Sequence, residues 1–165
     1  MITFKNASVA DVSLLQQLAH TIWYNHYPGI ITNEQIAYML NEMYSGIVIE
    51  QEILKGYSWT IIKENENPIG FMEFHLEKEN DSVKLSKLYI LVSHHGKGIG
   101  QQALDYVKNI SKELGAKKSL FLTVNKENKK AIKAYEKSGF IKYKEATFDI
   151  GNGFVMDDYI MKYTF

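Results

Sequence analysis

The sequence predicts an α/β domain built on one mixed, mostly antiparallel sheet of about seven strands, flanked by helices. The composition is that of a folded protein, with 45% hydrophobic and 23% charged residues in a chain of 165. Apolar residues recur with a helical period over roughly the first third of the chain and then with the period of strands. Helical and strand patterns alternate after that, as in α/β proteins. The length is that of one domain, so a single domain over residues 1–165 is expected.

The first third reads as a short strand followed by helices. Ser8 with Asp11, and Thr32 with Gln35, are capping boxes, in which side chains three residues apart bond to the backbone amides of a helix start. Apolar residues at helical spacing follow each box, so each box predicts the start of a helix. The other elements expected here are a strand at residues 2–5, an aromatic turn near residues 23–28 and a short helical piece at residues 46–55.

Three strands joined by short turns are expected next. The segments between them are rich in Asn, Asp, Ser and Pro, which favour turns. Links this short join antiparallel neighbours, because a parallel connection needs a long crossover. The expected strands cover residues 57–63, 69–77 and 83–92.

The remainder alternates helices and strands. A glycine-rich segment at residues 96–100 leads into a helix that Gly115 ends, and a helix over residues 128–138 is ended by Gly139, since Gly is the usual residue after a helix C-terminus. Residues 151–153, Gly-Asn-Gly, form a hairpin turn between the last two strands. A compact buried strand is expected between the two helices, at residues 120–124.

Composition excludes several kinds of chemistry. The chain has no Cys, so disulfides, thiolate metal sites and cysteine nucleophiles are ruled out. No apolar stretch approaches the ~20 residues of a membrane span, and the start of the chain lacks the pattern of a signal peptide. A cytoplasmic location, no membrane partner and no metal are therefore expected.

Charge is unevenly distributed, although the formal net charge is zero. All 19 basic residues are Lys, and residues 84–144 hold 14 of them with only four acidic residues. The lysines either coat two solvated helix faces or attract an anionic ligand, while the acidic remainder attracts a cation. Without Arg the chain cannot make bidentate contacts to phosphates or bases, so nucleic acid is not expected as a partner.

The most informative segment runs from Leu88 to Gly100, where three glycines at alternate positions join a buried strand to a helix. Gly allows a tight turn and lets a ligand approach the backbone without meeting a Cβ. The first amides of a helix have no partner within the helix, and the helix dipole favours an anion there. A phosphate or pyrophosphate bound at residues 96–101 is the physical expectation.

Other nucleotide-binding patterns fit less well. Gly98, Gly100 and Ala103 formally match the dinucleotide pattern G-x-G-x-x-A, but the ribose-binding carboxylate expected about 20 residues later is missing, since the next strand ends at Asn125. The Walker pattern and the G-x-S-x-G nucleophile elbow are absent. A glycine-rich turn without a ligand remains the bland alternative.

Two motifs resemble those of the GNAT superfamily of N-acetyltransferases. His95-Gly96-Lys97-Gly98-Ile99-Gly100 resembles its acyl-CoA signature, and Asn128, Ala131, Tyr135, Gly139 and Phe140 resemble a second signature at the proper distance. The resemblance covers nearly the whole chain in element order. It implies a single N-acetyltransferase domain, acetyl-CoA as the acyl donor and an amine as the acceptor.

The resemblance also implies the roles of individual residues. Backbone groups of the strand before the glycine loop bind the pantetheine arm and polarise the thioester, amides of the loop hold the pyrophosphate, and Tyr135 protonates the departing thiolate. Independently, Asn128 and Tyr135 lie on one helical face, and a Tyr hydroxyl can donate a proton as charge develops. The implied cofactor contacts are Ile90, Val92, His95, Gly96, Lys97, Gly98, Ile99, Gly100, Gln101, Asn125 and Asn128.

One residue departs from the family signature. His95 stands where the family has Arg or Gln. Backbone amides make most of the phosphate contacts, so the loop should still bind. Because the charge of His changes near neutrality, the affinity and its pH dependence can differ.

The base that removes the amine proton is less clear from sequence. Glu73 sits mid-strand among apolar residues, where loss of solvation would raise its pKa toward that of a useful base, unless its strand face is open to solvent. Many relatives carry Glu on the strand before the glycine loop, but this chain has Lys84 and Lys87 there. Glu73 is therefore the candidate base.

Candidates for the acceptor site lie at both ends of the chain. Asp157 and Asp158 are neighbours on the last strand, so they point to opposite faces and at most one enters a given pocket to bind a cationic amine. Trp23, Tyr24 and Tyr27 precede a turn where family members form one wall of the acceptor site. These aromatic side chains either contact the substrate or pack a loop.

The favoured function is direct acetyl transfer to a primary amine, since a chain without Cys cannot form an acetyl-cysteine intermediate. The chain resembles most the branch with spermidine and spermine acetyltransferases, and the acidic remainder suits a small cationic amine or polyamine. Within the class, the alternatives are a protein N-terminus or Lys side chain, and then an antibiotic amine. A non-catalytic acyl-CoA-binding module and a nucleotide-dependent oxidoreductase are the alternatives outside it. A homodimer is compatible with the family.

Overall fold

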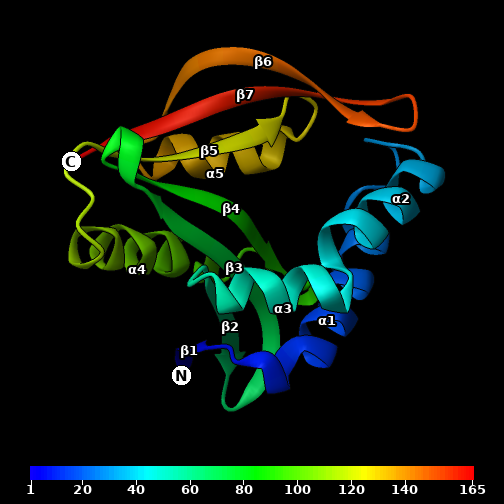
Figure 1. Ribbon diagram of the computed structural model, residues 1–165, viewed down its shortest axis with the longest axis horizontal. Helices are drawn as coiled ribbons and strands as arrows, with labels where there is room; N and C mark the ends of the chain where they lie inside the picture. The colour runs from blue at the N-terminus through cyan, green and yellow to red at the C-terminus, as the bar shows by residue number, and fades with distance from the viewer. The chain divides into compact units, whose positions relative to one another are not determined.

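The computed structural model describes all residues from 1 to 165, and it confirms the predicted α/β class with seven strands (Figure 1). The sheet order is β1-β2-β3-β4-β5-β7-β6, and most neighbours are antiparallel, whereas β4 and β5 are parallel. The strands are β1 (Ile2–Asn6), β2 (Ser58–Glu64), β3 (Asn67–Glu77), β4 (Ser82–Ile90), β5 (Ser119–Asn125), β6 (Ile141–Gly151) and β7 (Phe154–Thr164). The helices are α1 (Val12–His26), α2 (Asn33–Tyr44), α3 (Gly46–Leu54), α4 (Ile99–Glu113) and α5 (Lys129–Lys137), with 3₁₀ turns at Val9–Asp11, Lys78–Asn80 and Val92–His94.

The chain divides into two compact units. Unit 1 comprises Met1–His75 and Lys87–Ala103, and unit 2 comprises Leu76–Ser86 and Leu104–Phe165. A single acetyltransferase domain over residues 1–165 stays a prediction. None of the helices combines the length and the apolar character that a membrane-spanning helix needs.

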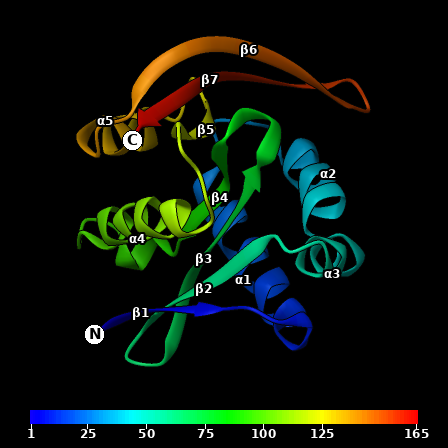
Figure 2. The same ribbon diagram turned by 60° about the vertical axis from the view of Figure 1, so that its left-hand side comes forward.

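In unit 1, helices α1 to α3 group beside β1, β2 and β3 (Figure 2). The local signals in the sequence set where these helices begin. The Ser8 amide donates to Asp11 Oδ2 over 2.9 Å, and the Gln35 amide donates to Thr32 Oγ1 over 3.1 Å. Large aromatic side chains fill the core of this unit, and Trp23, Tyr44, Trp59 and Phe71 are each almost fully buried.

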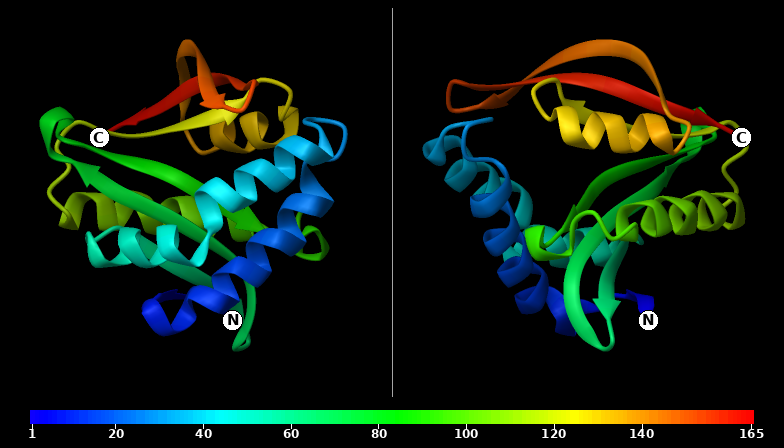
Figure 3. Two further views of the ribbon diagram at one scale, coloured as in Figure 1. Left: turned by 45° about the vertical axis from the view of Figure 1, so that its right-hand side comes forward. Right: turned by 180° about the vertical axis from the view of Figure 1, so that it is seen from behind.

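In unit 2, the long hairpin of β6 and β7 continues the strand pairing of β5, and α5 lies along one face of these strands (Figure 3). Phe140 packs between α5 and β7, because its ring centroid lies 5.9 Å from that of Tyr135 on α5 and 5.7 Å from that of Tyr163 on β7. Leu120 and Leu122 are buried, whereas the alternate residue Phe121 is half-buried and points to the opposite face.

The strand before the glycine loop is shorter than predicted. It ends at Ile90 and not at Val92, because the Leu91 amide makes a last bond to the Ile69 carbonyl, 2.8 Å away, and the 3₁₀ turn then begins. Helix α1 runs to His26, so it covers most of the aromatic turn expected near residues 23–28. The remaining elements match their predicted ranges within about two residues, the usual uncertainty of element ends.

Candidate active site

The glycine loop has the bare backbone that an anion needs. Gly96 and Gly98 both have φ of +77°, in the left-handed region that other residues rarely adopt. A Cβ placed on either glycine would meet no atom within 4 Å, so the space beside the loop backbone is open. Helix α4 begins at Ile99, and its first amides have no partner within the helix. The residues present therefore fit a pyrophosphate.

The His95 side chain links this loop to the end of β4 by a hydrogen bond. Its Nε2 lies 2.8 Å from the carbonyl oxygen of Ile90, the last residue of β4, and donates a hydrogen bond to it. The imidazole therefore holds the loop against the strand end. His95, which stands where the family signature has Arg or Gln, thus contacts the backbone next to its own loop.

Most of β4 has no strand partner on its β5 side. β4 pairs with β5 only over Ser82–Lys84, the first three of its nine residues. At Ile90 the carbonyl accepts from His95, and a carbonyl oxygen has a second lone pair for another donor. Val92 follows in the 3₁₀ turn with its side chain half exposed.

Helix α5 carries the second motif. Asn128 is its N-cap: the side-chain Oδ1 accepts a hydrogen bond from the Ala131 amide over 3.3 Å. Asn125 holds the turn before it by accepting from the Glu127 amide over 2.9 Å. Burial raises the pKa of Tyr135 to about 12, so its phenol stays protonated near neutrality. A protonated phenol can donate a hydrogen bond to a thiolate.

Glu73 lies in a buried ionic cluster of unit 1, and this corrects the argument that desolvation raises its pKa. Only 1% of its side chain is exposed, and burial does favour the neutral form. However, a hydrogen bond from His75 and the charge of Lys87 outweigh burial, so the pKa of Glu73 lies below its ordinary value. Its Oε1 is 2.8 Å from His75 Nδ1, and its Oε2 is 3.2 Å from Lys87 Nζ. Glu73 is therefore ionised and already paired.

The sequence analysis did not predict that three other residues of this cluster, Lys87, Glu52 and His75, belong to the site. Lys87 Nζ also lies 3.5 Å from Glu52 Oε2, and Glu52 accepts from Trp59 Nε1 over 2.9 Å. His75 is stacked on Tyr57, with ring centroids 3.9 Å apart. Two signals were present in the sequence: His75 follows Glu73 by two residues, so both face the same side of β3, and Lys87 interrupts an apolar strand.

The aromatic residues at the end of α1 differ in exposure. Trp23 and Tyr27 are 1% and 5% exposed, whereas Tyr24 is 43% exposed. The Trp23 ring packs 4.5 Å from that of Tyr27 and 5.5 Å from that of Tyr44. Trp23 and Tyr27 are thus part of the core, and only Tyr24 presents its ring to solvent. A substrate contact by these three residues stays a prediction.

Asp157 and Asp158 take opposite faces of β7, as their adjacency predicts. Asp157 is exposed and lies 2.9 Å from Lys126 Nζ. Asp158 is only 4% exposed, and its Oδ1 has no hydrogen-bond partner. Burial and the neighbouring charge of Asp157 raise the pKa of Asp158 to about 6. Asp158 is therefore the member of the pair that a cationic group would stabilise.

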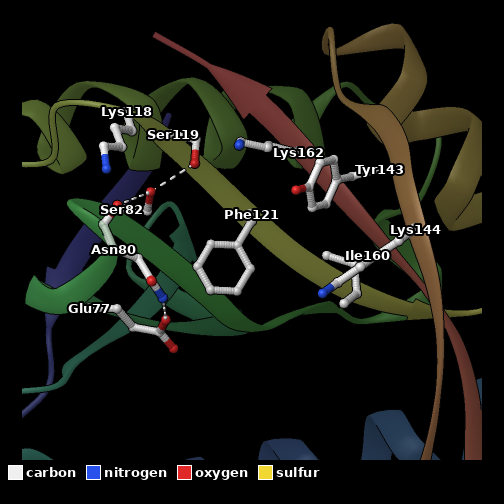
Figure 4. Close-up of a pocket in the computed structure, with 10 residues that line it drawn as sticks. All are labelled: Glu77, Asn80, Ser82, Lys118, Ser119, Phe121, Tyr143, Lys144, Ile160 and Lys162. Atoms are coloured by element: carbon white, nitrogen blue, oxygen red, sulfur yellow. Dashed lines mark hydrogen bonds between the residues drawn. The ribbon is translucent and has the colours of Figure 1, made fainter.

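A cavity of about 360 Å³ in unit 2 opens on the strand face opposite α5 (Figure 4). Phe121 lies at its centre, and the Ser82 and Ser119 hydroxyls bond to each other at one side, 2.9 Å apart. Its charged lining is mostly basic, which disfavours a cationic amine. These charged residues are Lys118, Lys144, Lys162 and Glu77.

The comparisons with known proteins decide the family. A family model described as the acetyltransferase (GNAT) family matches residues 21–140. The chain belongs to the GNAT acetyltransferases. It is an N-acetyltransferase, which confirms the enzyme class that the two motifs indicate.

Among its relatives, a spermidine N(1)-acetyltransferase from Thermoplasma acidophilum is 27% identical over 84% of this chain and 88% of its own. The crystal structure of PaiA N-acetyltransferase from Thermoplasma acidophilum, in complex with coenzyme A, has a TM-score of 0.84 at 25% identity over 100% of this chain and 99% of its own. A ribosomal-protein-alanine N-acetyltransferase from Brucella melitensis shares the fold, with a TM-score of 0.73 at 18% identity over 99% of both chains. These similarities support acetyl-CoA binding by this GNAT protein.

Proposed function

We propose that this GNAT protein acetylates a primary amine of a small cationic acceptor, of which a polyamine is the leading example. The donor is acetyl-CoA, which supplies an acyl group activated as a thioester. The observation that carries the acceptor class is Asp158, a buried carboxylate with an unpartnered oxygen. A cationic group there would supply the missing partner and lower the cost of the buried charge. The relative named as a spermidine acetyltransferase supports the same class.

On the donor side, the glycine loop would hold the pyrophosphate through backbone amides of residues 95–101. Backbone groups of Ile90 and Val92 would hold the pantetheine arm, and an amide on this strand would polarise the thioester carbonyl. Asn125 and Asn128, at the start of α5, would contact the same arm. His95 would act indirectly, by keeping the Ile90 carbonyl and the loop in one position.

Tyr135 would serve the leaving group. Its pKa of about 12 exceeds that of a thiol, about 8.5, so complete proton transfer to the thiolate is unfavourable by several pKa units. We therefore assign Tyr135 the stabilisation of the departing sulfur by a hydrogen bond, with the proton transferred as the product leaves. Tyr24 and Asp157 would each contribute little to acceptor binding, because both side chains are exposed to solvent.

The test is release of free thiol from acetyl-CoA with a panel of amines: spermidine, spermine, amino acids and short peptides. The protein contributes no thiol background, because the chain has no Cys. Turnover with polyamines and none with peptides is the expected result. Turnover with peptides alone would favour the protein N-acetyltransferase alternative. Tight coenzyme A binding with no turnover on any amine would favour a non-catalytic acyl-CoA-binding module.

Three further expectations belong to this proposal. A homodimer and a cytoplasmic location are compatible with the family and stay predictions. Nucleic acid is not expected to bind, since the chain has no Arg for bidentate contacts.

A further inference from the structure

We propose that His75 is the group that takes the proton from the acceptor amine and that Glu73 positions it. This inference rests on the proposed amine acetylation. It starts from the buried ionic cluster of unit 1, in which Glu73 uses its two oxygens differently. Oε1 binds the His75 imidazole over 2.8 Å, and Oε2 binds Lys87 over 3.2 Å.

Glu73 determines which nitrogen of His75 can act as a base. The carboxylate is ionised, because its pKa is lowered, and an ionised carboxylate only accepts hydrogen bonds. His75 Nδ1 must therefore carry a hydrogen. In the neutral ring the lone pair then lies on Nε2, the nitrogen that has no protein partner. The pair is thus set to accept a proton at Nε2.

The surroundings hold this ring in place and leave it accessible. Tyr57 stacks on the imidazole with an angle of 9° between the ring planes. The His75 side chain is 14% exposed, whereas Glu73 is 1% exposed, so a substrate reaches the histidine and not the carboxylate. Glu73, which contacts the ring, is linked through Lys87 to Glu52, and the formal charges of these three groups sum to one negative charge. That charge favours an approaching ammonium.

The cluster lies close to the proposed donor site along the chain. Lys87, which contacts Glu73, precedes Ile90 on β4 by three residues, a distance of about 10 Å in a strand. Contacts of the pantetheine arm with Val92 and then Ile90 would point its acyl end toward Lys87. A base in this cluster would then lie near the acyl end of the pantetheine arm, where the amine attacks.

The step balances as follows. The ammonium gives one proton to His75 Nε2, which leaves a neutral amine and an imidazolium. The amine nitrogen then forms a bond to the thioester carbonyl carbon, and the carbon–sulfur bond breaks with its electron pair on sulfur. The acylated nitrogen carries a positive charge until it loses its second proton. That proton passes to the thiolate, which the Tyr135 hydroxyl stabilises until then, and the imidazolium returns the first proton to solvent.

The experiment compares two acceptors in wild type and His75→Gln. Spermidine is protonated at neutral pH and must lose a proton before it attacks, whereas 2,2,2-trifluoroethylamine is largely neutral and can attack without that step. His75→Gln is expected to lower kcat/KM for spermidine about 100-fold and for the weakly basic amine less than about fivefold. Added imidazole should restore part of the loss in His75→Ala. Equal losses with both amines, or kcat/KM for spermidine within twofold of wild type, would overturn the assignment.

Two controls separate this inference from the proposed function. His20→Gln, at an exposed position of α1, should leave both rates unchanged. Failure of wild type to acetylate any amine would contradict the proposed function itself. Nitrogen NMR of the free protein then decides the inference without turnover: hydrogen on Nδ1 of neutral His75 is expected, with its partial loss from that position in Glu73→Leu, which has no acceptor atom. Hydrogen on Nε2 of the wild-type ring would overturn it.

Discussion

The hydroxyl oxygens of Tyr27 and Tyr89 lie 2.9 Å apart and share a hydrogen bond. Tyr27 follows the last residue of α1, and Tyr89 is the penultimate residue of β4. This bond therefore joins the aromatic core of unit 1 to the strand that leads into the glycine loop. Tyr89 also packs against Trp23, with ring centroids 5.6 Å apart, so the strand end is held by both polar and apolar contacts.

Tyr89→Phe should lower the free energy of unfolding by about 1 kcal/mol, the usual net value of one hydrogen bond. Tyr27→Phe should cost a similar amount, and the double variant should cost less than the sum, because both changes remove the same bond. Urea unfolding of the four proteins measures this. Strict additivity of the two losses would show that the hydroxyls do not interact in solution.

Gly98→Ala, compared with Gly115→Ala, should separate the effect of a left-handed alanine on stability from its effect on coenzyme A binding. Both Gly98, with φ of +77°, and Gly115, with φ of +94°, have open space where a Cβ would lie. Alanine at either position should cost about 1–2 kcal/mol of stability through the left-handed backbone. Only Gly98→Ala should also weaken coenzyme A binding, by more than about tenfold in calorimetry, because Gly115 lies at the other end of α4. Equal affinities in the two variants would contradict a pyrophosphate site at the loop.

Tyr135→Phe should lower kcat about 100-fold and leave the Kd of coenzyme A within about threefold. Tyr143→Phe, at an exposed position of β6, is the matched control. Because the pKa of Tyr135 is about 12, its phenol should cause no fall in kcat as pH rises to about 11. A descending limb near pH 9 that disappears in Tyr135→Phe would show that the pKa is not raised.

Asp158 should make stability depend on pH in a definite direction. Its folded pKa is raised from 3.8 to about 6, so the folded state holds a proton that the unfolded state has lost between these values. The stability that this proton contributes is present below pH 4 and is lost as pH rises through 6. Asp158→Asn should therefore gain up to about 3 kcal/mol relative to wild type between pH 4 and pH 7. It should also raise KM for spermidine.

The exposed neighbour provides the control for that experiment. Asp157→Asn removes an ion pair with Lys126 at the surface, where such pairs contribute little to stability. It should not reproduce the stability gain through pH 4–7. A wild-type stability that stays flat relative to Asp158→Asn over that range would refute a raised pKa.

Lys87→Met should destabilise the protein by about 3 kcal/mol or more, because it leaves Glu73 charged and buried without its ammonium partner. Glu73→Gln in the same chain should recover part of the loss by removing the stranded charge. Thermal unfolding of the single and double variants measures the coupling. A double variant less stable than Lys87→Met alone would contradict this account.

The fold was predictable because its signals are local. Asp11 lies three residues from Ser8, and Gln35 three from Thr32, so each capping contact is visible in a window of four residues. The glycine loop was predictable for the same reason. The end of β4 was placed two residues too late, because the last ladder bond goes to Ile69, some twenty residues earlier in the sequence.

The acceptor side could be predicted only in part. Glu73 was correctly singled out as an acidic residue in a buried strand, but the direction of its pKa shift was wrong. That direction depends on His75, two residues further along β3, and on Lys87 from β4. The sequence shows that Lys87 interrupts an apolar strand, but not that its ammonium lies beside Glu73. The pattern likewise placed Asp157 and Asp158 on opposite faces, but which face is buried depends on the packing of β7 between its neighbours.

The place of β7 between β5 and β6 has a consequence for how the protein is made. During synthesis β5 and β6 leave the ribosome before β7, yet neither can pair with the other until β7 enters between them. The nascent chain must therefore hold two unpaired strand edges until β7 has emerged, and edges of this kind invite aggregation. The many lysines on this stretch, among them Lys142 and Lys144 on β6, would keep such a waiting chain soluble by mutual repulsion.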